Sequence, residues 1–153
     1  MADSDLIEMW RVSARITRYV LDDIPEAHLV DKLGARAWTV GRHFAHVHNN
    51  RRDWLRGAKD LQAQVAEVPD ERAGDRALLQ SALDSSAEVM VQMLVRAVET
   101  GKVSGFKRPP AIFTGYLISH EAYHVSEISV ILAQNGHRLP NEIAWGIWEW
   151  DKR

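Results

Sequence analysis

Apolar residues recur at steps of three and four over four long stretches of the chain, the spacing typical of amphipathic helices. The first stretch covers residues 5–22, with Asp5 and Glu8 at capping-box spacing, and it ends at an Ile-Pro step that a helix cannot continue through. The second covers residues 40–58, with Thr39 as its N-cap. We expect a helix over each.

The remaining two stretches predict a second pair of helices. One covers residues 75–99 and ends at Gly101, a residue suited to the left-handed conformation that closes helices. The other begins near Phe113 and ends at the Asn-Gly pair at 135–136. Sustained period-two alternation is absent, so no strand is predicted. The pattern therefore predicts an all-α fold, a four-helix bundle.

A short Trp-rich segment, residues 141–150, follows Pro140 and carries Trp145, Trp148 and Trp150. We expect it to cover the bundle or to form a dimer contact, because tryptophan marks large buried contacts and interfaces. The sequence has neither an internal repeat nor a low-complexity linker. We therefore expect residues 1–153 to form a single domain.

The amino-acid composition excludes several kinds of site and partner. The chain of 153 residues contains no cysteine, which excludes disulfides, thiolate zinc sites and a cysteine nucleophile. Its 19 basic and 21 acidic residues are scattered, which argues against a nucleic-acid partner. Apolar runs are far shorter than the ~20 residues of a membrane span, and the acidic N-terminus does not resemble a signal peptide. We expect a soluble, cytoplasmic protein.

Seven histidines are the most informative residues of the composition, and two of them lie four apart in the last predicted helix. His120 and His124 fall on one helix face, ~6 Å apart, so two imidazoles can converge on one ion. Both lie within the stripe expected to face the core, where they need partners. A metal ion would satisfy both, with Glu121 and Glu127 as neighbouring acceptors. A hydrogen-bonded core pair is the alternative.

A third ligand has to come from another helix, and residues 40–58 offer three histidines. At 100° per residue, His43 lies beside the apolar stripe, His46 lies toward its edge and His48 falls on the opposite flank. The pattern alone leaves the choice open and slightly favours His43.

Two sequence segments resemble motifs of the DinB-like family. The segment Trp-Thr-Val-Gly-Arg-His-Phe-Ala-His-Val, residues 38–47, is similar to its second-helix signature, in which histidine follows tryptophan by eight residues. His120-Glu121-Ala122-Tyr123-His124 is similar to its HxxxH motif. The segments 136–142 and 148–150 also resemble the end of such proteins, whereas Val125-Ser126-Glu127 stands where many members have Arg-Gly-Gln.

This resemblance implies a four-helix bundle, often dimeric, in which three histidines hold a divalent ion, commonly nickel or zinc. By position the ligands are His46, His120 and His124, and His43 moves to the pocket wall or to a supporting contact. Activities assigned in the family are thiol-dependent transferases and isomerases, beside members described as metal-dependent hydrolases.

We therefore expect a metal-dependent enzyme acting on a small molecule, of the thiol-S-transferase or hydrolase type, with a low-molecular-weight thiol as a candidate substrate. The alternative is a non-catalytic metal-binding stress or interaction protein with a structural ion, which a fourth ligand such as Glu127 or His43 would favour. A metal-free bundle that binds a partner through its Trp-rich end is the third reading.

For the other polar residues near the histidines, the sequence predicts structural roles and no chemistry. Arg51, Arg52 and Asp53 are expected to form a solvated face. Ser119 and Ser126 flank the HxxxH histidines and are expected to serve helix packing.

Overall fold

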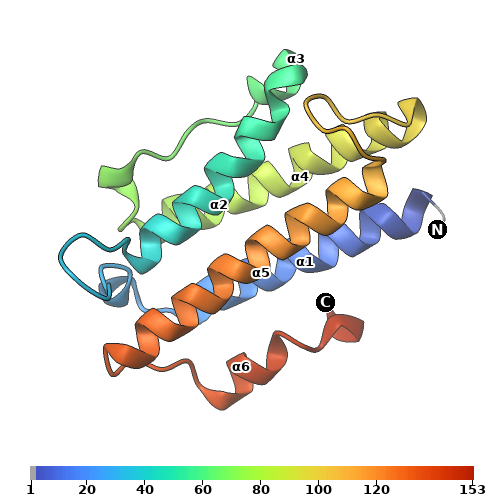
Figure 1. Cartoon of the computed structure of the whole chain (residues 1–153). Coiled ribbons are helices and arrows are strands. Elements are labelled where there is room, and N and C mark those ends of the chain that lie inside the picture. Colours follow the sequence, from blue (N-terminus) through green and yellow to red (C-terminus); the bar gives the residue numbers. More distant parts are fainter. Residues whose placement is uncertain (1–2) are drawn as a thin grey trace.

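Four long helices form the body of the protein (Figure 1). The computed structural model describes residues 3–153, with side chains from residue 5 onward. The long helices are α1 (Asp3–Asp23), α2 (Val40–Trp54), α4 (Arg76–Thr100) and α5 (Pro110–Gln134). Both α1 and α2 pack against α4 and α5, so α1 and α2 occupy opposite corners of the bundle. In Figure 1, α1 and α5 run in one direction and α2 and α4 in the other. The predicted all-α bundle is confirmed.

Short elements complete the described part of the chain. They are α3 (Lys59–Gln62), α6 (Asn141–Gly146) and the 3₁₀ turns Glu26–His28, Leu55–Gly57, Asp70–Arg72 and Trp150–Lys152. Residues 3–153 contain no β-strand beyond one isolated bridge. Within this range, every helix is too short or too polar to traverse a lipid bilayer. α3 was not predicted, because a single helical turn has no periodicity to detect.

Helix ends follow four of the five predicted signals, and α1 ends at Asp23, directly before the Ile-Pro step. The Thr39 side chain accepts a hydrogen bond from the Arg42 backbone N–H at 3.1 Å, as an N-cap does. Gly101 closes α4 in the left-handed conformation, with φ of 68°, and Gly136 closes α5 with φ of 79°. The predicted capping role of Asp5 is wrong, because α1 already includes Asp3 and therefore passes through Asp5.

The hydrophobic core is divided into two clusters along the bundle axis. One includes Val20, Leu21, Phe44, Leu83 and Ile128. The other includes Trp10, Leu55, Met90, Phe113 and Leu117. On each long helix, the residues between the two clusters include a buried polar side chain. A polar layer therefore crosses the middle of the bundle.

The polar layer is built around an ion pair between Arg51 of α2 and Glu121 of α5. Arg51 donates from Nε and Nη2 to the two carboxylate oxygens, at 2.7 and 2.9 Å. Thr17 of α1 donates to the same carboxylate at 3.0 Å. On α4, Arg51 Nη1 donates to the Leu83 carbonyl and to the Ser86 hydroxyl. One ion pair with its hydrogen bonds thus joins all four long helices.

This arrangement overturns the expected solvated face at the end of α2. Arg51 is only 1% exposed, because α4 and α5 both pack over that flank. Arg52 is half-buried and donates to the Val65 carbonyl. Val65 belongs to the returning segment, residues 63–75, which leads from α3 back to α4. Of the three, Asp53 alone is exposed, where it pairs with Arg56.

The C-terminal segment, residues 140–153, contacts the bundle through aliphatic side chains. Ile143 and Ile147 pack against the first hydrophobic cluster, whereas Trp145 and Trp148 are exposed. Figure 1 shows the segment running back beside α1 and α5. The expected cover is therefore formed by the isoleucines and leaves the indoles free for other contacts.

Removing either partner of the ion pair should destabilise the fold strongly, because the other charge is left buried and unpaired. We expect Arg51→Met or Glu121→Leu to lower the free energy of unfolding by about 3–5 kcal/mol. The double variant should lose less than the two single losses combined, because neither charge then remains. Urea unfolding followed by circular dichroism measures all three. Arg96→Ala, which breaks an exposed pair with Asp60, is the control; a loss for Arg51→Met no larger than for this control would contradict the assignment.

Candidate metal centre

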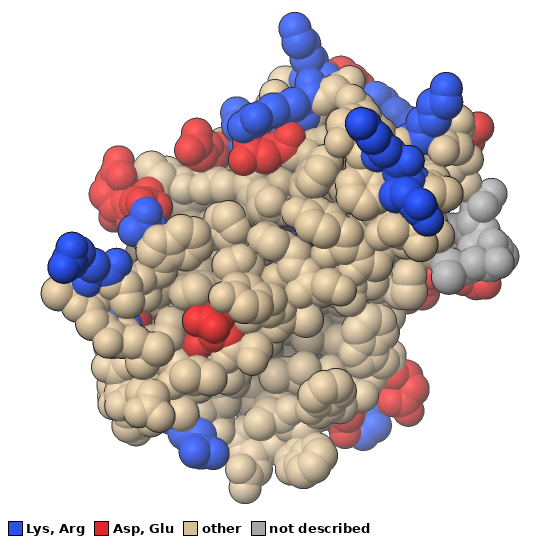
Figure 2. Space-filling view, in the orientation of Figure 1, with Lys and Arg blue, Asp and Glu red and all other residues tan. Residues whose placement is uncertain are grey.

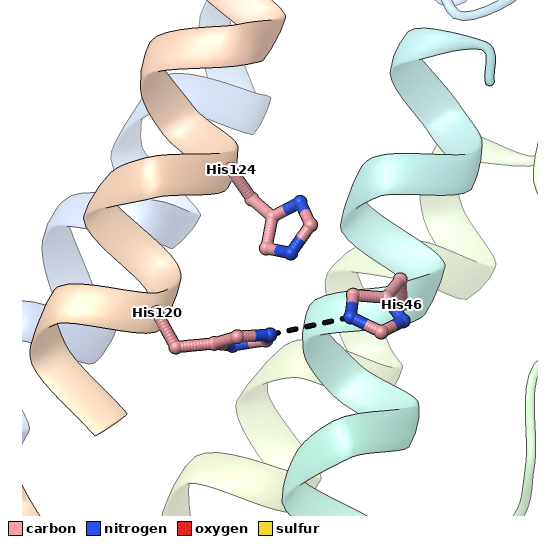
Figure 3. A group of neighbouring side chains, drawn as sticks. All are labelled: His46, His120 and His124. Carbon is pink, nitrogen blue, oxygen red and sulfur yellow. Dashed lines mark hydrogen bonds between the residues drawn. The ribbon is translucent and has the colours of Figure 1, made fainter. Parts of the chain in front are cut away.

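Three histidines from two helices converge at the surface of the polar layer (Figure 3). His46 comes from α2, and His120 and His124 lie one helical turn apart on α5. One ring nitrogen from each lies within 4.8 Å of the other two. The Nε2 atoms of His46 and His120 are 3.2 Å apart. His124 is buried and the other two are half-buried, so the group is open on one side.

His43 contacts His124 of this group but is not one of the three converging histidines. Its Nδ1 lies 3.0 Å from Nδ1 of His124. The other ring nitrogen of His124 points toward His46 and His120 (Figure 3). A hydrogen bond at one imidazole nitrogen fixes which nitrogen is free to act as a ligand. The structure thus gives His43 the supporting contact that the resemblance implied, instead of the place that the helix pattern slightly favoured.

His48 faces away from the group, on the flank predicted from the helical wheel. Its ring is buried, with Nδ1 2.9 Å from the Ala82 carbonyl and Nε2 2.7 Å from the Ala66 carbonyl. These contacts attach α2 to α4 and to the returning segment. Its role is structural.

Trp38, in the loop before α2, covers one side of the histidine group. Its ring centroid lies 5.1 Å from that of His46 and 6.4 Å from that of His124, the latter nearly parallel at 10°. The Arg42 guanidinium stacks on the indole at 4.9 Å and pairs with Asp70 at 2.8 Å. This contact was not predicted from the sequence, although Trp38 begins the motif that contains His46.

The two glutamates expected to contact the histidines, Glu121 and Glu127, lie in different places. Glu121 points to Arg51, so its predicted hydrogen bond to the HxxxH histidines is wrong. Glu127 lines a cavity of about 380 Å³ beside His124, together with Trp38, His43 and Tyr123. Neither carboxylate belongs to the set of mutually close ligand atoms.

The packing role expected for Ser119 and Ser126 is also wrong, since both are exposed.

Burial keeps these imidazoles neutral, which leaves a nitrogen lone pair available for a cation. Desolvation is the main reason that the pKa of His124 falls from 6.5 to about 3, with smaller contributions from repulsion by His120, His46 and His43. Desolvation also lowers the pKa values of His46 and His120. For His43 the same lowering of the pKa is partly opposed by the charge of Glu127.

The donor set fits a divalent ion of the kind that prefers imidazole. A tetrahedral zinc ion with nitrogen ligands at about 2.0–2.1 Å holds neighbouring nitrogens about 3.3 Å apart. The observed 3.2 Å between His46 and His120 matches this separation. The sequence has no cysteine, so a thiolate cannot complete the set. Three imidazole donors with one open side can hold such an ion.

The lowered pKa values predict acid sensitivity of the chelator-treated protein. The unfolded chain binds protons at these histidines near pH 6.5, whereas folded His124 does so only near pH 3. The stability linked to neutral His124 is therefore complete above pH 6.5 and is lost progressively as the pH falls toward 3. Urea unfolding at several pH values, compared with His124→Asn, should show a steeper loss in the wild type. An NMR titration that finds the His124 imidazole protonating near 6.5 would contradict this.

Comparison with known proteins identifies the family of the chain. No curated protein matches the chain. A family model described as "DinB family" matches residues 1–145. That range contains the four long helices and all three converging histidines. The chain therefore belongs to the DinB family.

Proposed function

We propose that His46, His120 and His124 hold one divalent metal ion, zinc or nickel, and that the protein is a metal-dependent enzyme acting on a small molecule by thiol-S-transfer or hydrolysis. The observation that carries the proposal is the convergence of three neutral imidazoles, within 4.8 Å of one another, beside a cavity. Three protein ligands are typical of catalytic zinc sites, whereas structural sites have four. A bound ion would supply Lewis acidity to a coordinated water, thiol or carbonyl.

The surrounding residues have roles that suit such a site. His43 keeps the free nitrogen of His124 directed toward the other two histidines. Trp38 shields one side of the group from water, and Arg42 with Asp70 holds the indole in place. In the adjacent cavity, Glu127 is the only carboxylate among the lining residues. It offers an acceptor for a hydrogen-bond donor on the substrate.

The buried ion pair argues against a purely structural metal. Arg51 and Glu121 already connect α2 to α5 at the level of the histidines, without involving any of their rings. The first hydrophobic cluster also includes residues from both helices, and Trp54 of α2 packs against the second, which includes Phe113 of α5. Because α2 and α5 are joined by these contacts, an ion at the histidines is not needed to hold them together.

Metal content and activity of the purified, untagged protein test the proposal. Elemental analysis should find close to one zinc or nickel ion per chain. Assays with N-acetylcysteine and a panel of electrophiles, and with p-nitrophenyl esters, should show an activity that chelation removes and readdition of the metal restores. Absence of metal after incubation with both ions would contradict the site. Metal without activity, together with unfolding on chelation, would favour the structural alternative.

Replacing His124 with alanine should abolish metal binding and activity while leaving a folded bundle. Most helical stability comes from packing of the apolar faces, so the loss of one ligand should change the melting midpoint only modestly. Calorimetric titration with zinc and nickel measures binding, and circular dichroism measures folding.

His43→Phe is the matched control, because it changes a neighbouring imidazole outside the ligand set. It should retain binding, with affinity reduced about 10–100-fold through the lost support of His124. If His43→Phe abolishes binding and His124→Ala does not, the ligand assignment is wrong.

We also propose that the protein is a homodimer, and an apolar stripe on α5 supports this. Ile112, Tyr116, Tyr123 and Val130 lie on one side of the helix and are all exposed. The only acidic side chains of α5 are Glu121, which is buried, and Glu127, and the helix has no Lys or Arg. Figure 2 shows few charged side chains over this part of the surface. Exposed apolar patches of this kind mark interaction sites.

Sedimentation should therefore find a species of twice the 17.4 kDa mass of one chain at micromolar concentration. The double variant Ile112→Glu with Val130→Glu should sediment as a monomer, because it places charges within the stripe. Val95→Glu changes an exposed valine on α4 and should leave the dimer intact. A wild-type protein that is monomeric throughout would contradict the proposal.

A further inference from the structure

A second cavity lies between α1, α5 and the C-terminal segment, apart from the histidine group. Its volume is about 370 Å³, within the range of small-molecule sites. Ile16, Ile118, Val125 and Ile147 provide apolar walls, and Trp148 and Trp150 line its outer part. The α5 residues that line it are turned toward α1, whereas His120 and His124 are turned toward α2. In Figure 2 the surface is hollowed between α5 and this segment.

The C-terminal segment is held at two points, Gly146 and Arg153, which both contact Tyr19 of α1. Gly146 packs directly against the Tyr19 ring, where a larger side chain would collide with the phenol. The Arg153 guanidinium lies over the other part of the same ring, 3.7 Å from its centroid. Between these anchors, Trp148 and Trp150 are 75% and 39% exposed. Their indoles therefore form the rim of the cavity and do not fill it.

Ser13 of α1 presents its hydroxyl to the cavity. Ser13 is only 6% exposed and lines the cavity, yet its hydroxyl makes no hydrogen bond to any residue from 5 to 153. Thr17, one turn away, donates instead to Glu121. The Ser13 oxygen is not among the fully enclosed polar atoms that lack a partner, so it is open to the cavity and provides one specific hydrogen-bonding position for a ligand.

The lining also indicates what charge a ligand can carry. None of the lining residues is charged, and four of them bear hydroxyl groups: Ser13, Thr17, Ser126 and Ser129. A charged ligand would lose its hydration here without gaining a counter-charge. An uncharged ligand with flat apolar surface can instead pack against the two indoles.

We propose that this cavity binds an uncharged, largely apolar small molecule that carries one hydroxyl or carbonyl group, which hydrogen-bonds to Ser13. The site is independent of the metal centre. It is also distinct from the proposed dimer surface, because none of the stripe residues Ile112, Tyr116, Tyr123 and Val130 lines it.

Binding of 2-naphthol to the full chain tests the proposal, with 2-naphthoate as a charged probe on the same ring system. The naphthol is uncharged at neutral pH, because phenolic hydroxyls have pKa values near 10. Calorimetry should find one naphthol per chain and much weaker binding of the naphthoate. In ¹H–¹⁵N spectra, the indole signals of Trp148 and Trp150 should shift, and that of Trp10, in the second core cluster, should not.

Two substitutions and one control connect the binding to this cavity. Ala122→Trp fills the cavity from an exposed position on α5 and should weaken naphthol binding by about tenfold or more. Ser13→Ala should weaken it by about fivefold, the equivalent of one hydrogen bond. Ala77→Trp, at an exposed alanine of α4 outside the cavity, should have no effect. Circular dichroism melts verify that each variant is folded.

Three results would overturn the proposal. The first is no naphthol binding up to its solubility limit. The second is binding that Ala122→Trp leaves unchanged. The third is Trp148 and Trp150 signals that shift with protein concentration and not with naphthol, because the cavity would then be covered by a second copy of the chain.

Discussion

The buried pair of Arg51 and Glu121 is the interaction on which the arrangement of the bundle depends. Two charges in a protein interior are costly unless every hydrogen-bonding group is satisfied. Here the carboxylate accepts from Arg51 and Thr17, and the guanidinium also donates to α4. These directional bonds allow one register of α2 against α5, which hydrophobic packing alone would leave less defined. The layer lies between the two apolar clusters, so both contribute to the same register.

The histidine group follows from that register. His120 directly precedes Glu121, so the turn of α5 that places the carboxylate inside the bundle also directs the imidazole toward α2. His46 lies a little over one turn before Arg51 on α2, and its Nε2 is 3.2 Å from Nε2 of His120. Neighbouring contacts preorganise the ligands: His43 orients His124, and Trp38 covers the rings. A group assembled by the fold itself can keep the open side that the proposed catalytic role requires.

The sequence predicted what local patterns determine. The four long helices, the Thr39 cap and the Gly101 stop follow from apolar spacing and end signals. The HxxxH spacing indicated two of the three converging histidines. The third could not be chosen by helix pattern, because His43 and His46 both lie near the core edge, and only the family motif favoured His46. Arg51 looked like surface because its partners are distant in sequence: the carboxyl group of Glu121 is 70 residues away. Long-range ion pairs leave no periodic signal.

A crystal structure of the zinc- or nickel-loaded protein, with anomalous data collected at the metal absorption edge, tests the central claim most directly. We predict a single strong anomalous peak about 2.0–2.3 Å from one nitrogen each of His46, His120 and His124, with the remaining position not occupied by a protein side chain. A peak ligated by His43 in place of His46, a fourth ligand from Glu127, or no peak at these histidines would contradict the account.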